Sequence, residues 1–378
     1  MRRGERTAGG RCAAGRDVVV RHRTAAEGLE GRWGPVWAGT GVALGRVMLT
    51  RTIVASTLSL ALGGCFLTPD YAFIEADDVM IEPVRGAEYR ELTEYGDLYA
   101  ISMQSAHDVG GTIAAAIEGI EKVLKLLDRF PTDEDDEGYR VYGPYHPKDA
   151  EVSWLFRLDG DTDGSRFEVW VGPTSAGSRA DMQQLLSGEV AVAKTRRSGA
   201  FHLDFDVYEA HGEALKIGAD RDRHYTGVVE LRFERDLDSQ LKTIDIDYDD
   251  FTITQEVPIH DDFAATRYRF ARAADGAGSF HVDLAATFQW ALWSGPAIER
   301  AVIDMSWQAD GAGRAHGELR SEVEGDLLLG DMVLDECFDP RGALVWREVN
   351  EAYAEALPGY NKGDPRGCAA VELDAAVK

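Results

Sequence analysis

Two stretches near the middle of the chain, TGVVELRFE (226–234) and KTIDIDYD (242–249), alternate apolar and charged residues with a period of two. Successive side chains of a β-strand point to opposite faces, so each stretch predicts a strand with one buried face and one wet face. That division of faces is typical of antiparallel sheets. Each stretch places three large apolar side chains on one side: Val229, Leu231 and Phe233 in the first, and Ile244, Ile246 and Tyr248 in the second.

The same alternation recurs on both sides of this pair and predicts an antiparallel meander of nine to eleven strands between about residues 138 and 330. The turns between the segments are short and rich in Asp and Gly, and the sequence ADGAG occurs twice, at 274–278 and 309–313. Glycine supplies the positive φ that tight turns need, so the repeat predicts two similar hairpins. The alternating segments are 151–158, 166–172, 201–208, 266–273, 279–288, 300–307 and 315–323.

Residues 111–131 have a different period. Their apolar residues recur at steps of three and four until Pro131, which predicts an amphipathic helix, and a weaker helical pattern covers about 88–107. The predicted fold is therefore a β-rich α+β domain in which a large curved antiparallel meander sheet packs on this N-terminal helix. A sheet of that size must curl, split or close. The arrangement resembles the half-barrel of periplasmic lipoprotein carriers, although it shares no motif with them.

A short apolar run, residues 53–62, follows Arg51 and ends in Leu62-Gly63-Gly64-Cys65. A charged start, a short apolar segment and small residues at its end are typical of a secretory signal. The tetrapeptide resembles the lipobox of bacterial lipoproteins, which implies cleavage before Cys65 and attachment of palmitate-type acyl chains to it. Phe66 follows the cysteine in place of the Asp associated with inner-membrane retention. The resemblance therefore implies a lipid-anchored envelope protein at the outer membrane.

This signal divides the chain into segments. Residues 1–47 are rich in Arg, Gly and Ala without apolar periodicity, and we interpret them as a misassigned or disordered leader. Residues 48–64 are the predicted lipoprotein signal peptide, and 65–87 are a tether. Residues 88–378 form a single predicted domain, with helices over about 88–130 and a C-terminal segment, 331–378, closed by a disulfide. Whether Ala343–Val349 forms a last strand or starts a helix is open at this stage.

The net charge of the chain is −26, and since residues 1–64 carry +6, the mature chain carries about −32. DNA and RNA binding need clustered Lys and Arg, so this charge argues against nucleic acid as a partner. After cleavage at Cys65 only Cys337 and Cys368 are left as free thiols, and in an oxidising compartment they predict a disulfide. A metal site is the alternative, but the pair has no Cys or His neighbours at ligand spacing.

Asp159, Asp161 and Asp163 with Gly164 resemble the start of a calcium loop, where alternate carboxylates converge on the cation. Trp170 stands where such loops place a bidentate Glu, and the flanking segments are predicted strands. An acidic hairpin turn is therefore the favoured interpretation, and a weak structural Ca²⁺ is the alternative. No other cofactor is predicted.

Three classes of function follow from these patterns. The first is a binding module for an apolar or lipid ligand in the concavity between sheet and helix. The second is a structural or interaction protein that presents an acidic sheet face, including Asp245 and Asp247, to an envelope partner. A hydrolase comes third, since paired carboxylates can act as acid and base but the sequence contains no GxSxG, P-loop or HExxH motif. The aromatic residues expected to line an apolar cavity are Trp154, Phe205, Phe233, Phe270, Phe288 and Trp307.

Overall fold

The computed structural model describes a subset of the chain, and all of these residues belong to one compact unit, Gly41–Lys378. The predicted leader, the signal peptide with Cys65, the helix at 111–131 and Phe288 lie outside the described residues. The described residues are 74, 76–79, 81, 96–103, 105–106, 133–134, 138–146, 151–211, 223–255, 263–286, 299–321, 327 and 329–371.

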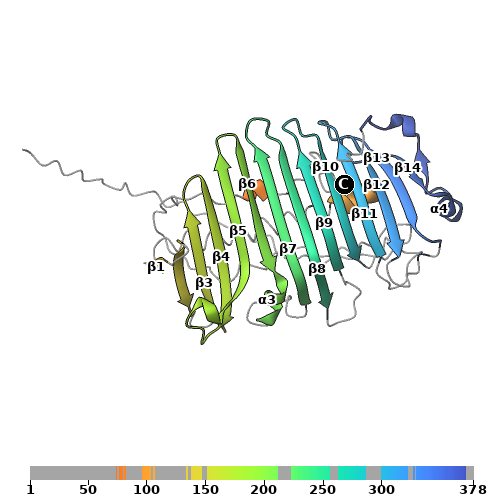
Figure 1. Cartoon of the computed structure of the whole chain (residues 1–378). Coiled ribbons are helices and arrows are strands. Elements are labelled where there is room, and N and C mark those ends of the chain that lie inside the picture. Colours follow the sequence, from red (N-terminus) through yellow and green to blue (C-terminus); the bar gives the residue numbers. More distant parts are fainter. Residues whose placement is uncertain are drawn as a thin grey trace, which may run out of the picture. The chain divides into compact units, whose positions relative to one another are not determined.

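Within these residues, fifteen strands form one antiparallel sheet in which each strand pairs with its neighbours in sequence. The sheet is an open meander with β1 and β15 at its edges. Figure 1 shows its strands following one another in sequence order from β3 to β14. The predicted antiparallel meander is thus confirmed. The strands are β1 (Asp133–Glu134), β2 (Arg140–Tyr145), β3 (Val152–Gly160), β4 (Gly164–Pro173), β5 (Gln183–Ala193), β6 (Arg196–Asp204), β7 (Arg223–Asp236), β8 (Lys242–Gln255), β9 (Phe263–Arg272), β10 (Gly278–Ala286), β11 (Glu299–Trp307), β12 (Gly313–Ser321), β13 (Met332–Phe338), β14 (Leu344–Val349) and β15 (Lys362–Gly363).

The sheet is larger than the nine to eleven strands predicted, because it continues beyond residue 330 and also includes β1 before residue 138. The predicted C-terminal segment contributes β13, β14 and β15, and Ala343–Val349 is resolved in favour of a strand from Leu344 onward. The disulfide between Cys337 and Cys368 is present, with the two Cα atoms 5.7 Å apart. It connects β13 to the loop after β15, so the C-terminal segment is both part of the sheet and closed by the bridge.

The predicted strand at 201–208 is wrong in its second half. Strand β6 ends at Asp204, and Phe205–Ala210 form the short helix α3. The Asp204 carboxylate accepts a hydrogen bond from the backbone N–H of Val207 at 2.9 Å, which is the usual role of an N-cap residue. Phe205 and Val207 have the spacing of two that suggested a strand, but Phe205 and Tyr208 are both buried, and residues three apart share one face of a helix and not of a strand.

The two ADGAG turns have the same hydrogen bonds, as the repeat predicts. In each, the backbone N–H of the glycine after Asp bonds back to the carbonyl three residues earlier, and the Asp carboxylate accepts from the N–H two residues later. Gly276 and Gly311, the glycines concerned, have φ of 95° and 94°. These backbone angles favour glycine, which explains why the motif recurs.

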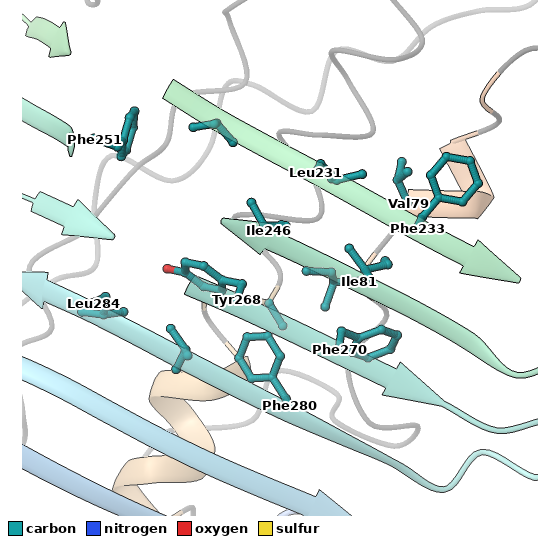
Figure 2. Packing of buried hydrophobic residues seen from close by; sticks show 14 of the residues in the cluster. Val79, Ile81, Leu231, Phe233, Ile246, Phe251, Tyr268, Phe270, Phe280 and Leu284 are labelled. Atoms are coloured by element: carbon teal, nitrogen blue, oxygen red, sulfur yellow. The ribbon is translucent and has the colours of Figure 1, made fainter. Parts of the chain in front are cut away.

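One face of the sheet, called the inner face here, carries the hydrophobic core. Leu231, Ile246 and Tyr268 lie side by side on β7, β8 and β9 in direct register, and Val79 and Ile81 pack over them from the N-terminal segment (Figure 2). The other face is called the outer face. The short helix α1 (Ala76–Val79) and the helical residues 97–103 and 105–106 supply further core residues, among them Leu98 and Ile101.

Aromatic rings on the inner face lie over glycines of the neighbouring strand. In the clearest pair, a Cβ built on Gly199 would lie 2.6 Å from Cε1 of Phe233, its direct partner across β6 and β7. Glycine leaves room for the ring, so the aromatic side chain packs directly against the backbone of the neighbouring strand. The four such pairs are Gly188–Phe167, Gly199–Phe233, Gly278–Trp307 and Gly313–Phe338.

Candidate functional site

The outer face carries a continuous row of mostly charged side chains that crosses the sheet from β3 to β14, called the outer row here. Each member is the direct cross-strand partner of the next, so the row runs perpendicular to the strands. Two-residue alternation places all of its members on the face opposite the core. In order, the row reads Asp159, Arg166, Glu189, Ala200, Arg232, Asp245, Arg269, His281, Asp304, His316, Asp335 and Glu348.

Ion pairs within and beside the outer row hold its side chains in place. Asp245 accepts a hydrogen bond from Arg269 at 3.3 Å, and Asp247 lies 3.0 Å from Arg232 and 2.7 Å from Arg267. These side chains are 20–55% exposed, and ion pairs at such exposure contribute less than about 1 kcal/mol to stability. Since little stability depends on them, these charges can change partners at low cost.

Histidines occupy two positions of the row in β10 and β12. The Nδ1 atom of His281 is 2.8 Å from Asp304, and that of His316 is 2.8 Å from Asp335. The hydrogen bond to Asp335 raises the pKa of His316 above its ordinary value, against the opposing effect of partial burial. The charge of this end of the face therefore depends on pH near neutrality.

The β2–β4 end of the outer face is covered rather than open. Leu155, Ala176 and Met182 form a small second hydrophobic cluster there. Beside it, the guanidinium of Arg157 is buried, pairs with Glu168 at 2.5 Å and stacks 4.0 Å from the centroid of the Tyr139 ring. The exposed part of the outer face therefore extends from β4 toward β14.

A hollow of about 640 Å³ opens in the outer face between β3 and β8. Its floor consists of small residues, and its rim carries side chains of both charges. The floor residues are Gly164, Ala191, Ser198 and Ala200, and the charged rim residues are Arg166, Arg196, Arg232, Asp159, Glu189, Glu234 and Asp245.

On the inner face, two of the buried ionic contacts among the described residues attach N-terminal segments to the sheet. In the first, Asp78 of α1 pairs with Arg197 of β6 at 2.9 Å, and Lys242 of β8 donates to the Asp77 carbonyl at 2.9 Å. Burial is the main reason that the pKa of Lys242 falls to about 8, and the nearby Arg235 adds to it. These interactions dock α1 onto β6–β8.

The second contact, called the Glu336 network here, lies on β13 and β14. The Glu336 carboxylate accepts hydrogen bonds from the backbone N–H groups of Asp97 at 2.9 Å and Leu98 at 2.8 Å. These two residues begin the helical stretch 97–103, called the second helix here. Arg347 pairs with Asp97 at 2.8 Å and stacks on Tyr360, whose hydroxyl donates to the same Asp97 carboxylate at 2.5 Å. Burial, with a further contribution from Asp97, raises the pKa of Glu336 to about 7, and Arg347 opposes this shift.

The predicted apolar-lining residues lie in the packed core. Phe205, Phe233, Phe270 and Trp307 are buried in one cluster, and Trp154 is half-buried at its edge. A cavity between the second helix and β11–β13 measures about 20 Å³, too small for an acyl chain. These residues therefore act as core where the structure describes them, and an apolar ligand stays a prediction.

The predicted calcium residues lie in the β3–β4 hairpin. Asp159 pairs with Arg166 at 2.5 Å, and Asp161 accepts from the backbone N–H of Asp163 at 2.8 Å, as an acidic turn does. Among the residues that the structure describes, no group of three or more acidic, His or Cys side chains is arranged to hold a metal ion. Calcium binding here stays a prediction.

The buried charges of the inner face were missed by the sequence analysis, although they carry a readable signal. Arg197, Lys242 and Glu336 are each in phase with the apolar positions of their strands. A charged side chain at such a position points into the core, where it needs a buried partner of opposite charge or a hydrogen bond. Which partner it finds depends on N-terminal segments more than 100 residues away, so the pattern within a strand could not identify it.

Comparison of the chain with family models, with curated proteins and with solved structures finds no match. Among the described residues, no helix has the length and apolar character needed to cross a membrane.

Proposed function

We propose that this chain is a lipid-anchored protein of the bacterial cell envelope, at the outer membrane, that presents the outer face of its sheet to an envelope partner. The observation that carries the proposal is the difference between the two faces. The inner face is filled by apolar side chains and docked N-terminal segments, whereas the outer row places mostly charged side chains on the opposite face from β3 to β14.

The composition of the outer face indicates the kind of partner. The outer row contains more acidic than basic members, and the whole chain carries −26. A partner with a basic surface would be attracted from a distance. Its basic side chains would then replace the arginines in the weak exposed ion pairs of the outer face. We therefore expect the association to weaken as salt is added, since exposed charges are screened within about 10 Å at 0.1 M.

Charge reversal tests the face. The double variant Asp245→Lys, Asp247→Lys places two positive charges in the centre of the exposed face and is expected to remove the dominant crosslinked partner in intact cells. The matched control, Asp238→Lys with Glu355→Lys, makes the same change of charge at exposed positions in a turn and on helix α4 (Glu351–Ala356). Crosslinking that is unchanged in the first variant, or lost equally in both, would refute an interface on this face.

Substitution at Cys65 tests the anchor. The change Cys65→Ser removes the thiol that the lipobox resemblance assigns to acylation, so we expect loss of palmitate labelling and release of the chain from the membrane fraction. The control Phe66→Leu changes the residue next to Cys65 but keeps the thiol, and should leave both unchanged. Palmitate labelling that persists in Cys65→Ser would contradict the proposed anchor.

A further inference from the structure

The outer row is interrupted at one position, Ala200 of β6. From β3 to β8 its other members are all charged, with Glu189 on one side of Ala200 and Arg232 on the other. Adjacent strands lie about 4.8 Å apart, so these two flanking positions are separated by roughly 10 Å. A methyl group cannot fill that space, and Ala200 accordingly lines the hollow.

The neighbouring row deepens the hollow. Gly164, Ala191 and Ser198 are consecutive cross-strand partners on β4, β5 and β6, and all three are small. Glu234 follows on β7 and pairs with Arg196 at 2.7 Å. Small residues on three adjacent strands thus form a floor, while paired long side chains stand around it.

The rim selects against simple ions of either sign. It carries three guanidinium groups and four carboxylates, so an anion meets four like charges and a cation meets three. A ligand that both donates and accepts hydrogen bonds can use both kinds of group, and a hydroxyl does both. Within the described residues, the exposed Glu189 carboxylate has no hydrogen-bond partner and is available to accept from such a group.

We propose that this hollow binds a carbohydrate: a neutral chain of sugar units lying over Ala200 and Ser198, with hydroxyls bonded to Glu189 on one side and to Arg232 on the other. The volume of about 640 Å³ falls within the range of small-molecule sites. This inference goes beyond the proposed function, since it concerns one hollow and a small ligand. It can hold or fail independently of that partner, because its tests at Ala200 and Glu189 leave Asp245 and Asp247 unchanged.

Calorimetric titration of the full chain tests the proposal with three probes: maltotetraose, cellotetraose and chitotetraose. We expect at least one of these sugars to bind with Kd below about 1 mM. The variant Ala200→Trp fills the hollow and should weaken the affinity for that sugar by at least tenfold. The control Ala285→Trp places the same ring on β10, outside the hollow, and should leave the affinity unchanged. Retention on insoluble cellulose or chitin in addition identifies a polymer as the source, whereas soluble binding alone identifies a free oligosaccharide.

A second variant keeps the test valid if Ala200→Trp fails to fold. Glu189→Ala removes an exposed carboxylate without a hydrogen-bond partner in the described residues, so it should fold normally and bind the sugar at least fivefold more weakly. Absence of binding by all three sugars, an affinity unchanged in both variants, or tighter binding of inorganic phosphate or spermidine than of any sugar would overturn the proposal. Crosslinking sensitive to Asp245→Lys, Asp247→Lys alongside such a result would leave the proposed function standing.

Discussion

Replacing Glu336 with alanine is expected to lower the free energy of unfolding by about 3 kcal/mol or more. The carboxylate is buried and accepts from two backbone N–H groups, those of Asp97 and Leu98, and each lost partner of a buried group costs about 1–3 kcal/mol. Its removal also takes a carboxylate from Arg347, 3.6 Å away. Denaturant unfolding followed by circular dichroism measures the change.

The matched control is Asp335→Ala, the adjacent residue on the same strand. Asp335 faces the other way, has a side chain that is 44% exposed and pairs only with His316 among the contacts described, so its removal should cost less than about 1 kcal/mol. Equal destabilisation by the two variants would show that the strand tolerates no change at all. It would contradict a specific role of Glu336 in docking the second helix.

The same residue gives the protein a pH dependence of known sign. The pKa of Glu336 is about 7 in the folded chain and its ordinary value is 4.5, so the folded state binds the proton more tightly. Stability from this group is therefore fully present below about pH 4.5 and is lost as the pH rises through 7. Position 336 cannot titrate in the variant Glu336→Gln. As the pH is lowered from 8 to 5, the free energy of unfolding of wild type should therefore rise by up to about 3 kcal/mol relative to that of the variant. A constant difference between the two proteins over that range would refute the shifted pKa.

Alternation within single strands was sufficient to predict the sheet and its two faces. Across the β7–β8 pair, apolar residues lie opposite apolar ones and charged opposite charged, as the predicted faces require, with Val229 opposite Tyr248 and Glu230 opposite Asp247. The pattern failed at Phe205, where a local side-chain cap ends the strand and the same residues also suit a helix. The spacing of apolar residues alone could not distinguish a strand from a helix there, because the four residues 205–208 are too few to establish either period.

The hollow and the Glu336 network could not be predicted, because they depend on register between strands. Ala200 is an unremarkable outward residue until β5 and β7 place Glu189 and Arg232 beside it. The partners of Glu336 come from residues 97 and 98, more than 230 positions away in the sequence. Such contacts form only when distant segments dock on the sheet. The sequence of the strand itself shows only that a charged residue occupies a position where the pattern expects an apolar one.

The second large effect is expected at Gly199, the position on which the Phe233 ring rests. A Cβ at this site would lie 2.5 Å from the Glu189 carbonyl oxygen and 2.6 Å from the ring. The ring is fully buried and the carbonyl belongs to the adjacent strand, so neither can move without disturbing the core. Gly199→Val should therefore lower the free energy of unfolding by more than about 3 kcal/mol, at the upper end of overpacking effects.

Two further variants separate ring clash from a general loss of strand structure. Ser198→Val introduces the same side chain one residue earlier on the outer face, where it should change the free energy of unfolding by less than about 0.5 kcal/mol. Gly199→Ala alone should lower the free energy of unfolding. Adding Phe233→Leu should restore part of that loss, because the smaller side chain leaves space for the new methyl group. A coupling energy of about 1 kcal/mol or more in this double-mutant cycle is expected. Strict additivity, or wild-type stability in Gly199→Val, would show that the ring does not depend on the glycine beneath it, and that aromatic cover of the backbone does not hold the inner face together.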